Sequence, residues 1–117
     1  MGRGEEGSGI QVLMKIRILP SAKRDLNAGF EFYEKQEAGV GSYFTDCLSS
    51  DISSLKLFAG SHRKRGDLHR FTSKRFPYWI YYRLEGETAY IVAVLDARRD
   101  PDFIERRERI ERRDSSS

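Results

Sequence analysis

The chain has 117 residues, of which 33% are charged, and a formal net charge of +3 at pH 7. This length allows one compact domain with a single modest core and excludes a second. No apolar run approaches the roughly 20 residues that span a bilayer, and the polar start MGRGEEGSGIQ has no signal-peptide character. The single cysteine, Cys47, excludes an internal disulfide and a cysteine-clustered metal site. We therefore expect a cytoplasmic protein that has no cofactor and does not contact a membrane.

The first expected elements are a leader and a strand. Residues 1–13 are glycine-rich, which favours a flexible leader. The folded domain is expected over residues 14–101. It opens with MKIRIL, in which Met14, Ile16 and Ile18 alternate with cations, the pattern of a half-buried strand.

Two helices are expected next. Ser21 is the predicted N-cap of the first, because its hydroxyl can accept a hydrogen bond from a free helical N–H group. Apolar residues at helical spacing follow in two stripes, first Ala22, Leu26, Phe30 and Tyr33, then Phe44, Cys47 or Leu48, Ile52 and Leu55. Gly39 and Gly41 separate the stripes, so the helices should form an antiparallel hairpin.

Three strands should complete an α+β fold. LHRFTSK, FPYWIYYRL and TAYIVAVL show the composition of strands. The order β-α-α-β-β-β places the helical hairpin on one face of a small, mainly antiparallel sheet, with the first strand at an edge or beside the last. Residues 102–117 should form a weakly docked C-terminal helix followed by a disordered DSSS tail. The second face of the sheet would then be open.

The expected open face carries cations and aromatic rings. Alternation in FPYWIYYRL places Trp79, Tyr81 and Arg83 on the side opposite Tyr78 and Ile80. In one interpretation these are ordinary surface residues. In the other, they join Lys15, Arg17 and Arg70 on a face that can stack bases and hold phosphates, or receive an acidic partner that folds as it binds.

Catalytic constellations are weak in this sequence. His62 and His69 are poorly spaced for zinc, and Cys47 falls in a helical apolar stripe, which indicates a core thiol and not a nucleophile. No nucleophile elbow or phosphate-cradling glycine loop is present.

Two ordered segments resemble a known family. MKIRILPSAKRDL and KRFPYWIYYRLEGETAYIVAVLDARRDP resemble the RelE/ParE superfamily of bacterial type II toxins, from about Met14 to Pro101. The resemblance implies the same β-α-α-β-β-β fold. It also implies a cognate antitoxin whose C-terminal segment wraps and neutralises the toxin, with operator DNA bound only through the antitoxin.

The two branches of the superfamily imply different targets. RelE-like members cut mRNA on the ribosome, and such chemistry would use Arg70, Arg83 and Arg98 on the phosphate with His69 or Tyr81 moving protons. ParE-like members poison DNA gyrase and need no nuclease chemistry. The sequence has no Tyr, His or Lys after Tyr90, and arginine is a poor general acid. The ParE-like branch is therefore favoured, with an mRNA endoribonuclease or a non-toxic antitoxin-binding homologue as alternatives.

The resulting candidate surface for target or antitoxin is basic and aromatic. Arg98 and Arg99, at the end of the last strand, are expected at its edge. The alternative is that this segment only forms the turn that follows the strand. The candidate residues are Lys15, Arg17, Arg63, Lys64, Arg65, Arg70, Arg75, Trp79, Tyr81, Arg83, Arg98 and Arg99.

Overall fold

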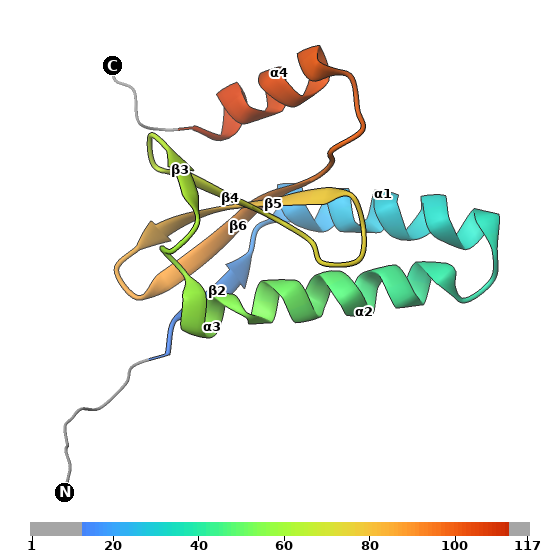
Figure 1. Cartoon of the computed structure of the whole chain (residues 1–117), viewed down its shortest axis with the longest axis horizontal. Helices are drawn as coiled ribbons and strands as arrows, with labels where there is room; N and C mark the ends of the chain where they lie inside the picture. The colour runs from blue at the N-terminus through green and yellow to red at the C-terminus, as the bar shows by residue number, and fades with distance from the viewer. Residues whose placement is uncertain (1–12, 113–117) are drawn as a thin grey trace, which may run out of the picture.

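The structure is a computed structural model that describes residues 13–112 (Figure 1). Most of the expected leader and the DSSS tail lie outside the described residues. The elements in chain order are β2 (Lys15–Ile18), α1 (Pro20–Gln36), α2 (Val40–Ser53), α3 (Leu55–Phe58), β3 (Arg63–Arg65), β4 (Leu68–Thr72), β5 (Tyr78–Glu85), β6 (Thr88–Asp96) and α4 (Pro101–Glu111). The predicted α+β class is confirmed.

The sheet has five strands in the order β2-β6-β5-β4-β3. β2 pairs parallel with β6, and the other neighbours are antiparallel. The parallel pair is possible because the whole helical hairpin lies between these two strands in sequence and carries the chain across the sheet. The first strand therefore lies beside the last, which is one of the two predicted arrangements.

β3 is a short strand that the sequence analysis did not predict. It pairs with β4 so that Arg65 faces Leu68 across a two-residue turn formed by Gly66 and Asp67. Gly66 has a φ of 63°, the left-handed conformation that such tight hairpin turns require at a central position. The Gly66-Asp67 pair therefore forms the turn of this hairpin among charged neighbours.

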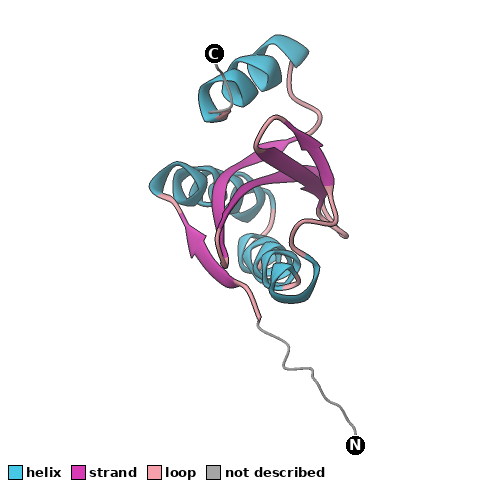
Figure 2. Ribbon diagram, turned by 90° about the vertical axis from the view of Figure 1, so that its left-hand side faces the viewer, coloured by secondary structure: helices cyan, strands magenta, loops and turns pink. Residues whose placement is uncertain are grey.

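The main core lies between the sheet and the α1–α2 hairpin, as Figure 2 shows on one side of the sheet. Its fully buried members include Phe44, Leu48, Ile80, Tyr82 and Ile91. The two helices approach closely because α1 carries a glycine at the crossing. A Cβ atom on Gly29 would lie 2.5 Å from Cζ of Phe44.

The start of α1 differs from the prediction. Leu19 is the N-cap residue, without a side-chain hydrogen bond, and Pro20 occupies the first turn, where its missing N–H group costs nothing. Ser21 does not cap the helix. Its Oγ donates a hydrogen bond of 2.7 Å to the carbonyl oxygen of Val92, so this serine ties α1 to β6.

The second face of the sheet is covered by α4, which Figure 2 shows opposite the hairpin. A smaller apolar cluster forms there, and Ile104 of α4 is 7% exposed within it. Asp100 caps this helix by accepting a hydrogen bond from the N–H of Asp102 at 3.1 Å. The expectation of an open face is therefore wrong for residues beneath α4: Tyr81 and Arg83 are only 2% and 6% exposed.

Candidate functional site

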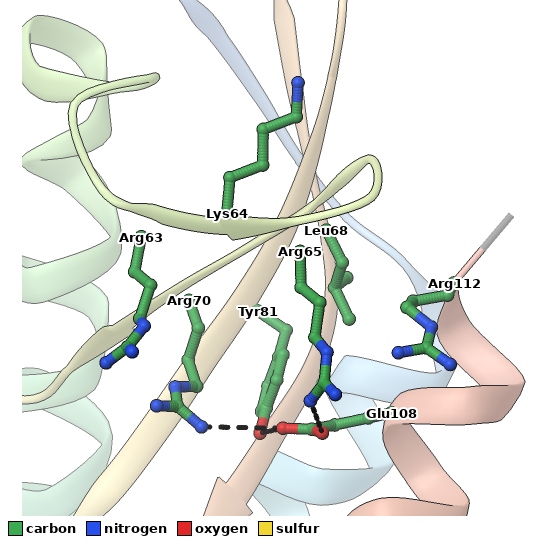
Figure 3. A pocket seen from close by; sticks show the side chains of 8 residues that line it. All are labelled: Arg63, Lys64, Arg65, Leu68, Arg70, Tyr81, Glu108 and Arg112. Carbon is green, nitrogen blue, oxygen red and sulfur yellow. Dashed lines mark hydrogen bonds and ion pairs between the residues drawn. The ribbon is translucent and has the colours of Figure 1, made fainter. Parts of the chain in front are cut away.

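A basic cavity of about 370 Å³ lies between the β3–β4 hairpin and α4 (Figure 3). Its lining residues are Arg63, Lys64, Arg65, Leu68, Arg70, Tyr81, Glu108 and Arg112. The register of the strands places several of them on one face, since Arg63 faces Arg70 and Arg70 faces Tyr81. Lys64 belongs to the alternate set of side chains and points away from the cavity in Figure 3. We call this site the basic cavity.

The carboxylate of Glu108 occupies the centre of the basic cavity. It accepts a hydrogen bond of 2.6 Å from the hydroxyl of Tyr81. The guanidinium groups of Arg70 and Arg65 lie 3.5 Å and 3.9 Å from it, and the Glu108 side chain is only 13% exposed. The cavity thus holds an anion that is largely shielded from water, where charge attraction is stronger than at the surface.

Tyr81 is a hydrogen-bond donor in this arrangement. Burial, and then the hydrogen bond to Glu108, raise the pKa of its phenol far above the ordinary value. The phenol is therefore protonated at neutral pH. It is poorly suited to remove a proton from a substrate while Glu108 is bound to it.

Arg83 holds the end of α4. Its Nη1 donates a hydrogen bond of 3.1 Å to the carbonyl oxygen of Glu111, at the helix terminus where a cation is favoured. Its Nε lies 3.9 Å from carboxylate oxygens of Asp67 and Glu85 and makes no hydrogen bond among the described residues. The predicted role of Arg83 on an open face is incompatible with this burial.

A second link joins α4 to α1. Arg107 donates two hydrogen bonds of 2.9 Å to the carboxylate of Asp25, and Oδ2 of Asp25 also accepts from the N–H of Val94 at 3.0 Å. The bond to Asp25 raises the pKa of the Arg107 guanidinium. Sequence reasoning missed Asp25, Arg107 and Glu108, because no periodic or motif signal connects Asp25 with Arg107, 82 residues apart, or Tyr81 with Glu108, 27 residues apart.

Arg98 and Arg99 take different positions at the end of β6. Arg98 forms a two-pronged pair with Asp96, at 2.9 Å from Nε and 2.8 Å from Nη2, which lowers the pKa of that carboxyl. Arg99 lies over the ring of Phe103, 3.6 Å from its centroid. Asp100, which follows them, caps α4.

Arg99 also approaches the basic cavity. It lines a neighbouring cavity of about 310 Å³ together with Arg65, Arg70 and Trp79. The guanidinium of Arg70 lies 4.0 Å from the centroid of the Trp79 ring, a cation–π arrangement that fixes the cation in place. Arg99 and Arg70 therefore line one cavity, and the binding role assigned to them from the sequence stays a prediction.

Three other predicted cations lie elsewhere. Lys15 and Arg17 are exposed on β2, at the sheet edge opposite β3, so they do not join the basic cavity. Arg75 is exposed in the loop between β4 and β5 and lines none of the three cavities described above and below. The expected single basic face is thus divided among separate regions.

His69 lies on the wrong side of the sheet to work with Arg70. It stacks on Tyr82 at 4.8 Å between ring centroids and is 6% exposed, and its Nδ1 is 3.3 Å from the carbonyl oxygen of His62. Because Tyr82 belongs to the core under the helical hairpin, His69 is separated from the phosphate-binding candidates. This position argues against His69 as their proton-transfer partner.

Neither a metal-binding group nor a membrane-spanning helix is found within residues 13–112. No group of three or more His, Cys, Asp or Glu side chains there is arranged to hold a metal ion. No helix in the same range is long and apolar enough to cross a membrane.

Comparison with known proteins gives a family match and several structural similarities. Residues 16–101 match the family model described as ParE toxin of type II toxin–antitoxin system, parDE. No curated protein sequence matches the chain. The fold is similar to a structure titled the chromosomal ParDE toxin–antitoxin system of P. aeruginosa, with a TM-score of 0.66 and 15% identity over 74% of this chain and 98% of that chain. At this identity the likeness supports the predicted RelE/ParE-like fold alone.

Two other solved structures are less similar. The RelBE2 toxin–antitoxin complex of Mycobacterium tuberculosis has a TM-score of 0.43 and 23% identity over 73% of this chain and 99% of that chain. The isolated RelE toxin of E. coli has a TM-score of 0.41 and 17% identity over 83% of this chain and 98% of that chain.

Proposed function

Because the chain belongs to the ParE toxin family of type II toxin–antitoxin systems, we propose that it inhibits growth by binding a cellular protein, DNA gyrase. The observation that supports binding over nuclease chemistry is the carboxylate of Glu108 in the basic cavity. A bound carboxylate would repel an RNA phosphate, and it holds Tyr81 as a protonated donor. His69 lies on the other face of the sheet, so the two proton-transfer candidates are separated.

The proposal includes a cognate antitoxin. The basic cavity is complementary to an acidic segment of another chain, because it already accommodates a carboxylate between Arg65, Arg70 and Tyr81. An antitoxin side chain of the same chemistry would take the place of Glu108. Operator DNA would be bound through the antitoxin, and the pair would act in the cytoplasm.

A specific observation favours a second candidate function. Arg63, Arg65 and Arg70 converge on one cavity beside the Tyr81 hydroxyl, and this is an arrangement that can hold a phosphate. If α4 moved away, the same groups would be available for a ribosome-dependent mRNA endoribonuclease. The role of Arg98 in such chemistry is not favoured, because its guanidinium is paired with Asp96.

A supercoiling assay tests the leading proposal. Purified protein is titrated into DNA gyrase acting on relaxed plasmid, and inhibition or trapped cleavage complexes are expected, with reversal by the cognate antitoxin. Uninhibited gyrase would reject the gyrase target. Primer extension after induced expression separates the alternatives: new 5′ ends within translated codons identify the endoribonuclease, and growth without arrest identifies a non-toxic homologue.

A further inference from the structure

A row of aromatic rings lies on a surface that the basic cavity does not include. The ring of Phe32 lies 5.0 Å from Tyr33, Tyr33 lies 4.9 Å from Phe76, and Phe76 lies 5.7 Å from Tyr43, measured between centroids. The row runs from α1 over the β4–β5 loop to α2. Figure 1 shows that this loop reaches the hairpin. We call these four residues the aromatic row.

The two ends of the aromatic row are exposed beyond what the fold requires. Tyr33 and Phe76 pack against the buried ring of Phe44, so their place in the core is explained. Phe32 and Tyr43 are 47% and 50% exposed. Each of these two makes one ring contact with the row. The half-buried rings of Tyr33 and Phe76 connect these two exposed ends, and a continuous exposed apolar patch is typical of interaction sites.

Phe32 also forms one wall of an apolar groove of about 360 Å³ between α1, the end of β6 and the start of α4. The groove is lined mainly by small or apolar residues, namely Ala28, Gly29, Phe32, Tyr78, Val94, Leu95 and Phe103, with Asp25, Asp96 and Arg99 at its margins. A concave apolar site next to exposed rings can bury an apolar side chain of a partner, the arrangement found at the energetic centre of protein interfaces.

The charges around the aromatic row define the partner. Lys74 and Arg75 are exposed and directly precede Phe76 in the chain, Arg99 lines the groove together with Phe32, and Arg98 reaches the Tyr33 hydroxyl at 3.3 Å. Three carboxylates of this region are engaged within the chain: Asp96 binds Arg98, Asp25 binds Arg107, and Glu34 accepts from the N–H groups of Gly39 and Gly41. The exposed cations fit carboxylates on a partner.

A protein partner fits this surface better than a nucleic acid. Aromatic rings and arginines can stack bases, but a base or phosphate has no apolar side chain for the groove. Tyrosine, phenylalanine and arginine are the residues enriched in protein interfaces.

We propose that the aromatic row and the apolar groove dock the protein target of the toxin, through carboxylates and an apolar anchor on the target, while the antitoxin's acidic segment binds the basic cavity. This inference rests on the proposed function for the identity of the target. It assigns the two partners to two different surfaces of one small domain.

The test is a double variant, Phe32→Ser with Tyr43→Ser. Hot-spot rings contribute enough that their removal weakens binding by about tenfold or more. We therefore expect the concentration needed to inhibit gyrase to rise by at least that factor. Growth arrest on induction should be lost. The affinity for the cognate antitoxin and the melting temperature should stay close to those of the unaltered protein.

The matched control is Leu57→Ser with Phe58→Ser. These side chains are 62% and 56% exposed on α3, so the control removes exposed apolar area from another surface and should retain toxicity. Equal effects of both double variants, or growth arrest that persists in the Phe32 and Tyr43 variant, would overturn the inference. Loss of antitoxin binding, or of single-stranded oligonucleotide binding, in that variant would also overturn it.

The same experiment separates this inference from the proposed function. If the unaltered protein arrests growth without inhibiting gyrase, the gyrase target is wrong, and the growth comparison between the two double variants still decides whether this surface binds the target. If the unaltered protein neither inhibits gyrase nor arrests growth, both proposals are rejected.

Discussion

A single residue, Glu108, strongly affects the charge that the basic cavity presents to a partner. Its carboxylate binds Tyr81 and lies near Arg65 and Arg70, so cations that would otherwise attract a phosphate are partly neutralised within the chain. Hydrogen bonds to charged groups contribute more than neutral ones, and their loss is felt most where water is excluded. The electrostatic character of the basic cavity therefore depends on α4 being docked.

Glu108→Gln tests that dependence. Glutamine keeps an acceptor for the Tyr81 hydroxyl but removes the charge, so the free energy of unfolding should fall by about 1 to 2 kcal/mol, with faster hydrogen exchange of the α4 amides. Glu105→Gln is the control, because Glu105 is 72% exposed and its ion pair with Arg109 is long, at 4.0 Å. Equal losses from the two substitutions, measured by denaturant unfolding, would contradict the assigned role of Glu108.

Tyr78 predicts how stability responds to alkaline pH. Burial raises its pKa to about 12, with a smaller contribution from Asp96. An unfolded tyrosine ionises near pH 10, so between these values the unfolded state releases a proton that the folded state retains. The free energy of unfolding should therefore fall as pH rises from about 10 to about 12. Tyr78→Phe should make this fall shallower in chemical denaturation, and an unchanged slope would refute the assignment.

At the scale of elements, the hairpin is held by the close approach of α1 and α2. A Cβ on Gly29 would meet Phe44 at 2.5 Å, and that ring cannot easily move, because Tyr33, Phe76 and Tyr78 surround it. Glycine is here a packing requirement, although it is intrinsically unfavourable within a helix.

Gly29→Ala sets these two effects against each other. Alanine improves helix propensity by about 1 kcal/mol, whereas overpacking a rigid core costs about 1 to 3 kcal/mol. We expect the clash to win, with a net loss of unfolding free energy. Asn27→Ala provides the control, since Asn27 is exposed on the same helix and should gain stability from propensity alone. A stabilised Gly29→Ala protein in thermal unfolding would show that Phe44 can repack.

The elements also show where sequence reasoning succeeds. Helical stripes predicted α1 and α2, and alternation or strand composition predicted β2, β4, β5 and β6, because these patterns report which faces of an element are buried. β3 was missed because three consecutive cations hide a hairpin whose only signal is Gly66-Asp67. The docking of α4 was underestimated because few of its residues are apolar. It is held partly by Arg107 and Glu108, whose partners are remote in sequence.

At the scale of the whole molecule, the candidate site was predicted in part. Arg63, Arg65 and Arg70 meet Tyr81 at one cavity, whereas Arg75 lies apart from it. Lys15 and Arg17 do not, because the sheet order places β2 and β3 at opposite edges. Local alternation assigns a side chain to a face, but it does not order the strands across the sheet.

This division of charge predicts how the antitoxin associates. Replacing both Arg65 and Arg70 with glutamine should slow association with the cognate antitoxin by about tenfold at low salt and flatten its dependence on ionic strength. Replacing both Lys15 and Arg17 with glutamine alters the net charge equally at the opposite edge and should have a smaller effect. Stopped-flow measurements over a range of salt concentrations distinguish the two, and identical salt dependences would refute the location of the antitoxin site.

The parallel pairing of β2 with β6 has a consequence for synthesis of the chain. Lys15 pairs with Thr88 and Ile18 with Ile91, so β2 cannot pair with its neighbour until most of the domain has been translated. Contacts this distant in sequence form slowly. The α1–α2 hairpin, whose apolar side packs on the same sheet, must wait as well. A chain that ends before β6 therefore exposes apolar surface and forms no native domain, and the basic cavity and the aromatic row come into existence together, late in translation.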